Sequence, residues 1–531
     1  MQKYGRLRNL HMSICIISAI LILRLFYIQV VAGQYYSKMA AAQKISPFAE
    51  RIRGEVMDRS GEPLTGSYYE TYAVISPGWL TESQKRFLFE KHILGSLYVE
   101  KPQNIKISQE NTGIIKELLG RTPGVFMYKK KIRYGPEALA THVVGYNGKA
   151  GVEKTFNGIL SGTKDQNRID IVNDGYGQPI AGASNEEIDS RLWGVKLTLD
   201  KKIQSIVEKI MDEKVEKGAA VVLDANTGEI LAMASRPNYK QYRLKDYLDR
   251  QGAPLINRAV EGFAPGSIFK IIVLSAALEE NITSLEEEFI CPGYIKVGGN
   301  TFKCSSYEEG GHGRITLKDA MAHSCNSVFI ELGMRLGSEK ILEYARRFGL
   351  GEKVSIGLPE EKRGFIPQPD EVYYADLGNI SIGQGSIEIT PLQAAQMVLA
   401  IVNNGVMKKP YLIKEIIDLN GNIIKAPVVA EEKRIVSEGT SEKVREALEA
   451  VTKYGTGIYA TPDKKAWQSA GKTGTAEIKK NTYHAWFVGY FPAKNPRYVI
   501  SIFVEEGGSG PTKAAPVFRE IAEKLIEFNG E

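Results

Sequence analysis

The chain has 531 residues, a length that predicts three or four domains at about 150 residues each, or two large ones. Apolar residues make up 43% and charged residues 24%, close to the globular average, which excludes a disordered or fibrous protein. The net charge of +6 is spread along the chain without a dense basic block, so we expect no nucleic-acid partner. A mean hydropathy of −0.20 excludes a polytopic membrane protein, and four cysteines are too few for a disulfide scaffold.

One segment near the N-terminus departs from this average. Residues 12–32 are mostly apolar, and a helix of that length spans about 30 Å, the thickness of a bilayer core. A cleaved signal peptide is the alternative, but no small-residue cleavage site follows directly. Lys3, Arg6 and Arg8 precede the segment without an acidic residue, so the positive-inside rule places residues 1–11 in the cytoplasm. We therefore expect a single-pass cell-membrane protein with an extracytoplasmic body.

Residues 33–191 are mixed and polar, with short strand-like runs, and we expect a spacer or docking module there. The stretch at residues 51–61 predicts a strand that enters an Asp-Arg-Ser-Gly turn. That turn accounts for Asp58 without a catalytic role.

Residues 192–531 have the pattern of one α+β domain. The strands that we expect lie at both ends of this region, at residues 219–224, 229–235, 484–491 and 497–506. Amphipathic helices are expected at residues 203–217 and 514–528. Because strands bracket a long helix-rich middle, we expect both ends to contribute to one sheet.

A helix is predicted to open at Ser267, with Lys270 three residues later. The helix continues as Ile271–Leu278, which is apolar on every face and is therefore expected to be buried. Burial lowers the pKa of a lysine toward the range of a general base, and the i, i+3 spacing brings the amine within reach of the Ser267 hydroxyl. A serine beside such a base is an activated nucleophile. The structural alternative for Ser267 is an ordinary helix N-cap.

The Ser-x-x-Lys pattern alone is weak, because about two chance matches are expected at this length and composition. The chain has two further matches, at Ser161/Lys164 and Ser469/Lys472. A Ser-x-Asn motif follows at Ser324-Cys325-Asn326. A Lys-Thr-Gly motif is much rarer, with about 0.1 chance matches, and here it comprises Lys472, Thr473 and Gly474, followed by Thr475. It predicts an edge strand that faces a groove, where Gly474 would let a substrate backbone approach closely.

With these three motifs in this order, the sequence resembles the class B penicillin-binding proteins, which are monofunctional peptidoglycan D,D-transpeptidases. The resemblance covers nearly the whole chain and implies an α+β fold. It implies a transpeptidase domain of the penicillin-binding and β-lactamase type at residues 192–531, with an antiparallel sheet flanked by helices and a helical lobe. A pedestal or dimerisation domain at residues 33–191 and one transmembrane helix would precede it.

The resemblance also implies roles for the motif residues. Ser267 would attack the carbonyl of a D-Ala-D-Ala stem peptide, and Lys270 would take its proton. Ser324 and Asn326 would complete the proton relay and hold the substrate amide. The segment 472–475 would bind the terminal carboxylate, and the backbone N–H groups of Ser267 and Thr475 would form the oxyanion hole. Such an enzyme is acylated by β-lactams, requires no cofactor and works at the membrane beside a polytopic glycan polymerase.

Three cysteines and one histidine form a further pattern, and the sequence leaves the chemical state of these cysteines open. Cys291, Cys304, His312 and Cys325 have the spacing C-x12-C-x7-H-x12-C, which lacks the close pair of a diagnostic zinc site. Outside the membrane we expect first a Cys291–Cys304 disulfide. Buried free thiols and a structural Zn²⁺ are the alternatives, with His312 expected to be a loop residue rather than a ligand.

Two other functions are compatible with the same motifs. A β-lactamase of this fold would be a shorter soluble chain with a water-activating base, which we cannot identify here. A β-lactam sensor or a catalytically silent scaffold of the cell-wall machinery would keep the motifs without turnover. The sequence leaves open whether the protein serves division, elongation or sporulation.

Overall fold

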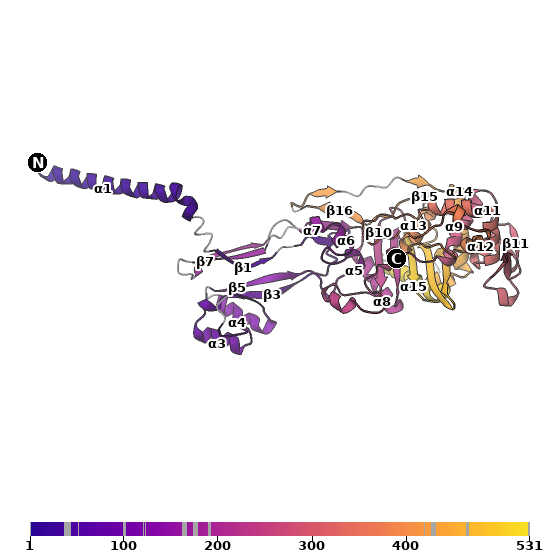
Figure 1. Cartoon of the computed structure of the whole chain (residues 1–531), viewed down its shortest axis with the longest axis horizontal. Coiled ribbons are helices and arrows are strands. Elements are labelled where there is room, and N and C mark those ends of the chain that lie inside the picture. The colour runs from indigo at the N-terminus through magenta and orange to yellow at the C-terminus, as the bar shows by residue number, and fades with distance from the viewer. Residues whose placement is uncertain are drawn as a thin grey trace. The chain divides into compact units, whose positions relative to one another are not determined.

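The structure is a computed structural model, and Figure 1 labels its elements. It describes residues 2–36, 44–50, 53–98, 102–119, 122, 124–161, 167–173, 179–188, 193–418, 420–425, 432–463 and 467–528. The chain divides into two compact units. Unit 1 consists of Met1–Arg53, Tyr68–Ile132 and Ser161–Ser190, and unit 2 of Gly54–Ser67, Arg133–Leu160 and Arg191–Glu531. The expected boundary between residues 191 and 192 lies outside the described residues.

The predicted membrane segment forms a long helix in unit 1. Helix α1 (Gln2–Phe26) continues into the π-helical turn η1 (Tyr27–Val31). Its Leu7–Val31 segment reaches a mean hydropathy of 2.4, is not buried by the rest of the chain and is long enough to cross a membrane. The helix begins ten residues before the predicted start at residue 12, because the polar residues ahead of it contain no proline to end it.

The rest of unit 1 holds two small antiparallel sheets. In one, β3 (Tyr68–Ile75) lies between β4 (Gln103–Lys106) and β5 (Val125–Ile132). Helices α3 (Glu82–Glu90) and α4 (Gln109–Leu119) pack on it, with Leu88 and Ile115 fully buried in a common core. The other sheet has the order β1 (Lys44–Glu50), β6 (Asn167–Asn173), β7 (Pro179–Ile188). Unit 1 is therefore α+β, as expected for a pedestal.

The centre of unit 2 is a five-stranded antiparallel sheet built from both ends of the region, as predicted. Its order is β10 (Ile230–Arg236), β9 (Gly218–Asp224), β21 (Tyr498–Val504), β20 (Thr482–Phe491), β19 (Ala470–Lys479). Helices α8 (Lys201–Lys214) and α15 (Gly510–Phe528) share a core with one face, which includes Val222 and Phe487. The alternate residues, such as Val221 and Val488, face the other core with α13 (Pro391–Val402).

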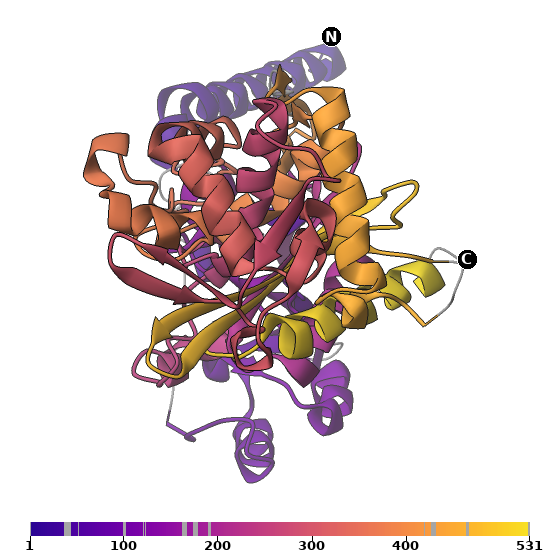
Figure 2. The ribbon, with the colours of Figure 1, turned by 90° about the vertical axis from the view of Figure 1, so that its right-hand side faces the viewer.

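A helical group beside this sheet forms the second part of unit 2, and Figure 2 looks toward it. Two short hairpins pair β11 (Glu288–Cys291) with β14 (Gly313–Thr316) and β12 (Tyr294–Val297) with β13 (Asn300–Lys303). The helices are α9 (Lys270–Glu279), α10 (Leu317–Ala322), α11 (Asn326–Arg347), α12 (Tyr374–Ser381) and α14 (Glu438–Lys453). Apart from this group, the short helices α5 (Thr141–Val144), α6 (Gly151–Thr155) and α7 (Asn157–Leu160) contact one another, and α5 also contacts β10 and α7 contacts β8.

One segment that the sequence assigned to the pedestal belongs to unit 2. Strand β2 (Glu55–Met57) pairs in parallel with β8 (Gly194–Leu197), which also pairs with β16 (Ile413–Ile417), and β17 (Ile423–Lys425) completes this sheet. The same unit includes residues 133–160, so the division at residue 191 is too simple. The local sequence predicted this strand, but it carries no signal of the distant strand with which it pairs.

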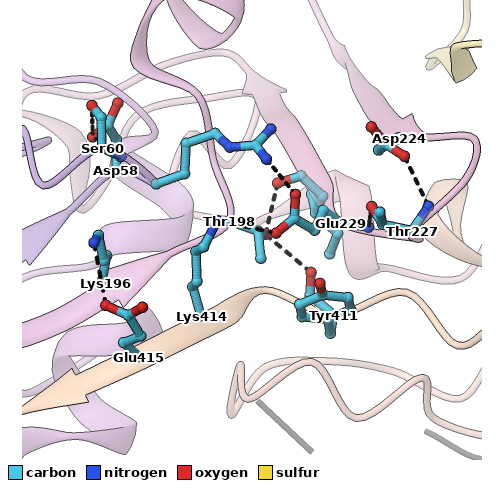
Figure 3. Close-up of polar contacts among 12 residues, drawn as sticks. Asp58, Ser60, Lys196, Thr198, Asp224, Thr227, Glu229, Tyr411, Lys414 and Glu415 are labelled. Atoms are coloured by element: carbon cyan, nitrogen blue, oxygen red, sulfur yellow. Dashed lines mark hydrogen bonds and ion pairs between the residues drawn. The ribbon is translucent and has the colours of Figure 1, made fainter. Parts of the chain in front are cut away.

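The carboxylate of Asp58, in the turn after β2, makes the hydrogen bonds of a turn, as predicted. Residues 51 and 52 of the predicted strand lie outside the described residues. One Asp58 carboxylate oxygen accepts the Ser60 N–H at 2.9 Å, and the other accepts the Lys201 N–H at 3.1 Å where α8 begins. Burial raises the pKa of Asp58, but these hydrogen bonds outweigh it and lower the pKa. Figure 3 shows this turn near Thr198, whose hydroxyl donates to the carbonyl oxygen of Tyr411 at 3.0 Å.

Candidate active site

Ser267 lies in a short 3₁₀ turn, η5 (Gly266–Phe269), which leads directly into α9. Pro265 caps the turn and Phe269 caps α9, so the N-cap alternative for Ser267 is wrong. Ser267 is half-buried, and among the described residues no side chain hydrogen-bonds to its hydroxyl. Gly266 has a φ of 55°, and a Cβ on it would lie 2.6 Å from the carbonyl oxygen of Thr475. A glycine is required here because strand β19 passes directly against the turn.

Lys270 is fully buried at the first position of α9, as its apolar surroundings predicted. Its Nζ donates to the carbonyl oxygen of Ser324 at 2.7 Å, to the Ser324 hydroxyl at 3.2 Å and to Asn326 Oδ1 at 2.8 Å. The Phe329 ring centroid lies 5.4 Å from the same nitrogen. Burial lowers the pKa of Lys270 to about 8. The amine is thus partly neutral near physiological pH, which a general base requires.

Ser324 and Asn326 are delivered by the sharp turn between α10 and α11. Ser324 has a φ of 57°, in the left-handed region that residues with a Cβ seldom adopt. Asn326 is the first residue of α11, and its amide also donates to the carbonyl oxygen of Lys303 at 3.0 Å. The structure therefore brings the Ser-x-Asn motif into contact with Lys270, whereas it records no direct bond between Lys270 and Ser267. Apo geometry of this kind does not exclude a catalytic pair.

The Lys-Thr-Gly motif lies on β19, the edge strand of the central sheet, as predicted. Lys472 is fully buried, and its Nζ donates to the carbonyl oxygen of Thr473 at 3.1 Å. Burial, followed by the nearby charge of Lys270, lowers the pKa of Lys472. A Cβ on Gly474 would lie 2.9 Å from the carbonyl oxygen of Pro265. The glycine thus admits the turn that carries Ser267, which is a different reason from the predicted approach of a substrate.

The strand also places Thr475, whose hydroxyl accepts the backbone N–H of Gly510 at 3.2 Å, where α15 begins. The carbonyl oxygen of Thr475 lies 3.4 Å from Nε2 of Gln384, which donates to it. Thr475 therefore connects the edge strand to two other elements of unit 2.

Of the other Ser-x-x-Lys matches, Ser469/Lys472 forms no such serine–lysine pair. Ser469 is buried and its hydroxyl donates to the carbonyl oxygen of Ala460 at 3.0 Å, a purely structural bond. Lys164 lies outside the described residues. Of the two lysines in these matches that the structure describes, both are buried, and only Lys270 lies on a helix, as expected.

Thr456 belongs to the same site and was missed by the sequence. Its hydroxyl lies 2.6 Å from the Thr473 hydroxyl, and its N–H donates to the carbonyl oxygen of Ala322 at 2.9 Å. It therefore bridges the Lys-Thr-Gly strand and the end of α10, which leads to Ser324. Its surroundings, Gly455-Thr456-Gly457, have no periodic pattern that could have marked it.

The cysteines differ from the first expectation. Cys291, Cys304 and Cys325 are all buried free thiols, so the predicted Cys291–Cys304 disulfide is wrong for this structure. His312 Nδ1 lies 3.5 Å from both Cys291 Sγ and Cys304 Sγ. His312 lies in a loop ahead of β14, as expected, and its ring also contacts the thiols. A hydrogen bond with Cys325 lowers the pKa of Cys304 to about 3, and the same contact raises the pKa of Cys325.

This arrangement matches known proteins. The model of the penicillin binding protein transpeptidase domain matches residues 218–523. Stage V sporulation protein D of Bacillus subtilis is 32% identical over 94% of this chain and 82% of its own length. The crystal structure of penicillin-binding protein 3 from Mycobacterium tuberculosis in complex with aztreonam is 28% identical, with a TM-score of 0.66 over 91% of this chain and 97% of the other.

A further neighbour is a chain from a structure that describes polymerization and crosslinking by a peptidoglycan synthase complex. It is 26% identical, with a TM-score of 0.75 over 97% of both chains. The matched region includes η5, the α10–α11 turn and β19, which carry the three motifs. The shared domain, the arrangement of motifs around Lys270 and the similarity along nearly the whole chain together show that this protein belongs to the class B penicillin-binding proteins.

Proposed function

We propose that the protein is a peptidoglycan D,D-transpeptidase that cross-links stem peptides through an acyl-enzyme on Ser267. The observation that carries this is the buried amine of Lys270, three residues after Ser267 and held by Ser324 and Asn326. Its pKa of about 8 gives a base of suitable strength for a serine hydroxyl. Membership of the transpeptidase family supports the same reaction.

In the acylation half, the Ser267 hydroxyl oxygen attacks the carbonyl carbon between the two D-alanines while neutral Lys270 accepts the hydroxyl proton. The C–N bond breaks, and the leaving D-Ala amine receives a proton through Lys270 and Ser324, which share a 3.2 Å hydrogen bond. In the second half, an amine of a neighbouring stem peptide attacks the ester, and its proton returns through the same relay to Ser267. Each half thus uses one base that becomes an acid.

The Lys472 and Thr473 side chains bind the terminal carboxylate of the donor peptide in this proposal. Lys472 lies on the edge strand, where an extended peptide can lie alongside. A carboxylate there would favour the charged form of Lys472 and offset the burial that lowers its pKa. The backbone N–H groups of Ser267 and Thr475, which flank the close contact at Gly266, would bind the oxyanion.

Acylation by labelled penicillin, followed over time, tests the proposal. We expect one stable adduct per chain on Ser267 that persists for many minutes, because no carboxylate of the described residues hydrogen-bonds to Ser267 or Lys270 to activate water. Rapid repeated turnover of nitrocefin would instead identify a β-lactamase. An adduct that forms without any cross-linked product, when donor and acceptor peptides are supplied, would identify a sensor or scaffold.

For the location, we propose a single-pass anchor at Leu7–Val31 with the N-terminus in the cytoplasm and unit 2 outside. Lys3, Arg6 and Arg8 ahead of the anchor support this orientation. Accessibility of unit 2 to protease in spheroplasts tests it, and protection of unit 2 would contradict it. A polytopic glycan polymerase is the expected partner, by analogy with the peptidoglycan synthase complex, and co-purification from membranes tests that assignment.

A further inference from the structure

Three thiols and one imidazole lie close together beside the Ser324–Asn326 turn. Cys291 ends β11, Cys304 follows β13, His312 precedes β14, and Cys325 caps α11. Their ligand atoms all lie within 4.8 Å of one another. The three thiols are buried, and the fourth cysteine of the chain, Cys15, lies far from them in sequence on α1.

Three of the six separations between the ligand atoms fit a tetrahedral metal site. With Zn–S bonds of about 2.3 Å and a Zn–N bond of about 2.0 Å, two sulfurs lie about 3.8 Å apart and a sulfur and a nitrogen about 3.5 Å apart. Cys304 Sγ and Cys325 Sγ are 3.8 Å apart, and His312 Nδ1 is 3.5 Å from the sulfurs of Cys291 and Cys304. A disulfide would need about 2.0 Å between sulfurs.

Polar groups of the surrounding chain contact both the sulfurs and the imidazole. The Asn326 N–H donates to Cys304 Sγ at 3.3 Å, and the Ser327 hydroxyl lies 3.5 Å from Cys291 Sγ. The Ser306 hydroxyl lies 3.0 Å from His312 Nδ1. Among the described residues, it is the one hydrogen-bonding group other than the cysteines that contacts this nitrogen and could compete with a metal for it. A Cβ on Gly311 would lie 2.2 Å from the carbonyl oxygen of Cys291, so a glycine is required to bring His312 alongside Cys291.

We propose that Cys291, Cys304, His312 and Cys325 bind one structural Zn²⁺ that braces the Ser324–Asn326 turn. Three thiolates and one imidazole are the ligands that Zn²⁺ prefers, and four protein ligands leave no open position for a reacting water. Cys325 lies between the two residues whose oxygens accept the Lys270 hydrogen bonds. The metal thus fixes one wall of the active site. This consequence rests on the proposed function, whereas the metal site itself is independent of that function.

Elemental analysis of the full chain in detergent, purified from zinc-replete cells, tests the metal. We expect about one Zn²⁺ per chain in the wild type and in Cys15→Ser, the matched control outside the cluster. Cys304→Ser and His312→Ala should lose most of it. Full occupancy in both of these variants would overturn the ligand set, and a metal-free wild type would overturn the site.

Experiments on the wild type keep the test independent of variant folding. Removal of the metal and addition of Co²⁺ should produce the intense visible bands of tetrahedral thiolate-ligated cobalt. Cys291, Cys304 and Cys325 should resist alkylation until a chelator is added. Equal alkylation with and without chelator, or a Cys304–Cys325 disulfide in the protein as isolated, would overturn the proposal.

The bracing role has its own readout. Chelation should slow acylation by penicillin by about tenfold or more, because displacing a catalytic wall by about 1 Å costs up to about 10²-fold, and added Zn²⁺ should restore the rate. An unchanged rate in protein shown to lose its metal would overturn the bracing. Failure of the proposed function would appear differently, as a metal-loaded wild type that penicillin does not label at all.

Discussion

Two buried clusters meet at the Ser324–Asn326 turn, and they satisfy their polar atoms in different ways. On one side, the Lys270 amine lies within hydrogen-bond distance of three oxygens of the turn. On the other side, three thiols and an imidazole face one another and bring four metal-binding atoms together. A complete hydrogen-bond network positions a reacting group, whereas a set of converging metal-ligand atoms favours a cation between them.

The largest expected effect concerns the nucleophile, which belongs to neither network. Ser267→Ala should abolish covalent labelling by penicillin, because Ser267 leads directly into a helix that begins with the buried Lys270. Gel fluorescence measures the labelling, and an unchanged melting temperature controls for folding. Labelling that persists, or that maps by mass spectrometry to Ser161 or Ser469, would contradict the assignment.

Loss of the lysine should have the next largest effect. It should slow acylation without affecting the cysteine cluster, and so distinguish the roles of the two clusters. Lys270→Ala should slow acylation by about 10²–10⁴-fold, the range for a lost general base, while the Zn²⁺ content stays unchanged. In the wild type, the acylation rate should rise with pH through about 8 and then level off, because the neutral amine accepts the proton. Stopped-flow labelling across pH measures both, and a flat profile in the wild type would contradict the role.

A smaller effect is expected from the turn. Asn326→Ala removes an acceptor of Lys270 and should slow acylation by about 10–100-fold, as expected for a hydrogen bond to a charged group. The metal content should fall little, since the contribution of Asn326 to Cys304 is its backbone N–H. If Asn326→Ala lost the metal but kept its acylation rate, the division of labour between the clusters would be reversed.

The smallest expected effect is at Thr456. Thr456→Val removes the 2.6 Å contact with the Thr473 hydroxyl and should slow acylation about fivefold, the effect of one hydrogen bond. Thr456→Ser keeps the hydroxyl and should restore the rate. Equal rates for the valine and serine variants would show that the contact has no part in positioning the Lys-Thr-Gly strand.

Much of the active site follows from short motifs and local patterns. The apolar run Ile271–Leu278 identified Lys270 as buried, and the strand pattern after Lys472 identified an edge strand; both are confirmed. Each of the three motifs lies within one short segment of chain, where spacing translates directly into geometry.

Other features depend on contacts that no local pattern contains. The cysteine cluster draws on segments brought together by two small hairpins, so its spacing resembles no standard site. Strand β2 pairs with β8 far along the chain, which is why residues 54–67 were assigned to the wrong unit. Helix ends were off by a few residues, as at Lys214 instead of 217, because capping by tertiary contacts decides where a helix stops.

The left-handed backbone of Ser324 has a consequence for how far this protein can be stabilised. A residue with a Cβ at a φ of 57° costs about 1–2 kcal/mol, which glycine would not. Ser324→Gly should therefore raise the melting temperature while it removes the hydroxyl that contacts Lys270. Selection for thermal stability alone would favour glycine at this position. A serine at 324 therefore lowers the stability of the folded chain, and its proposed part in the proton relay with Lys270 accounts for that cost.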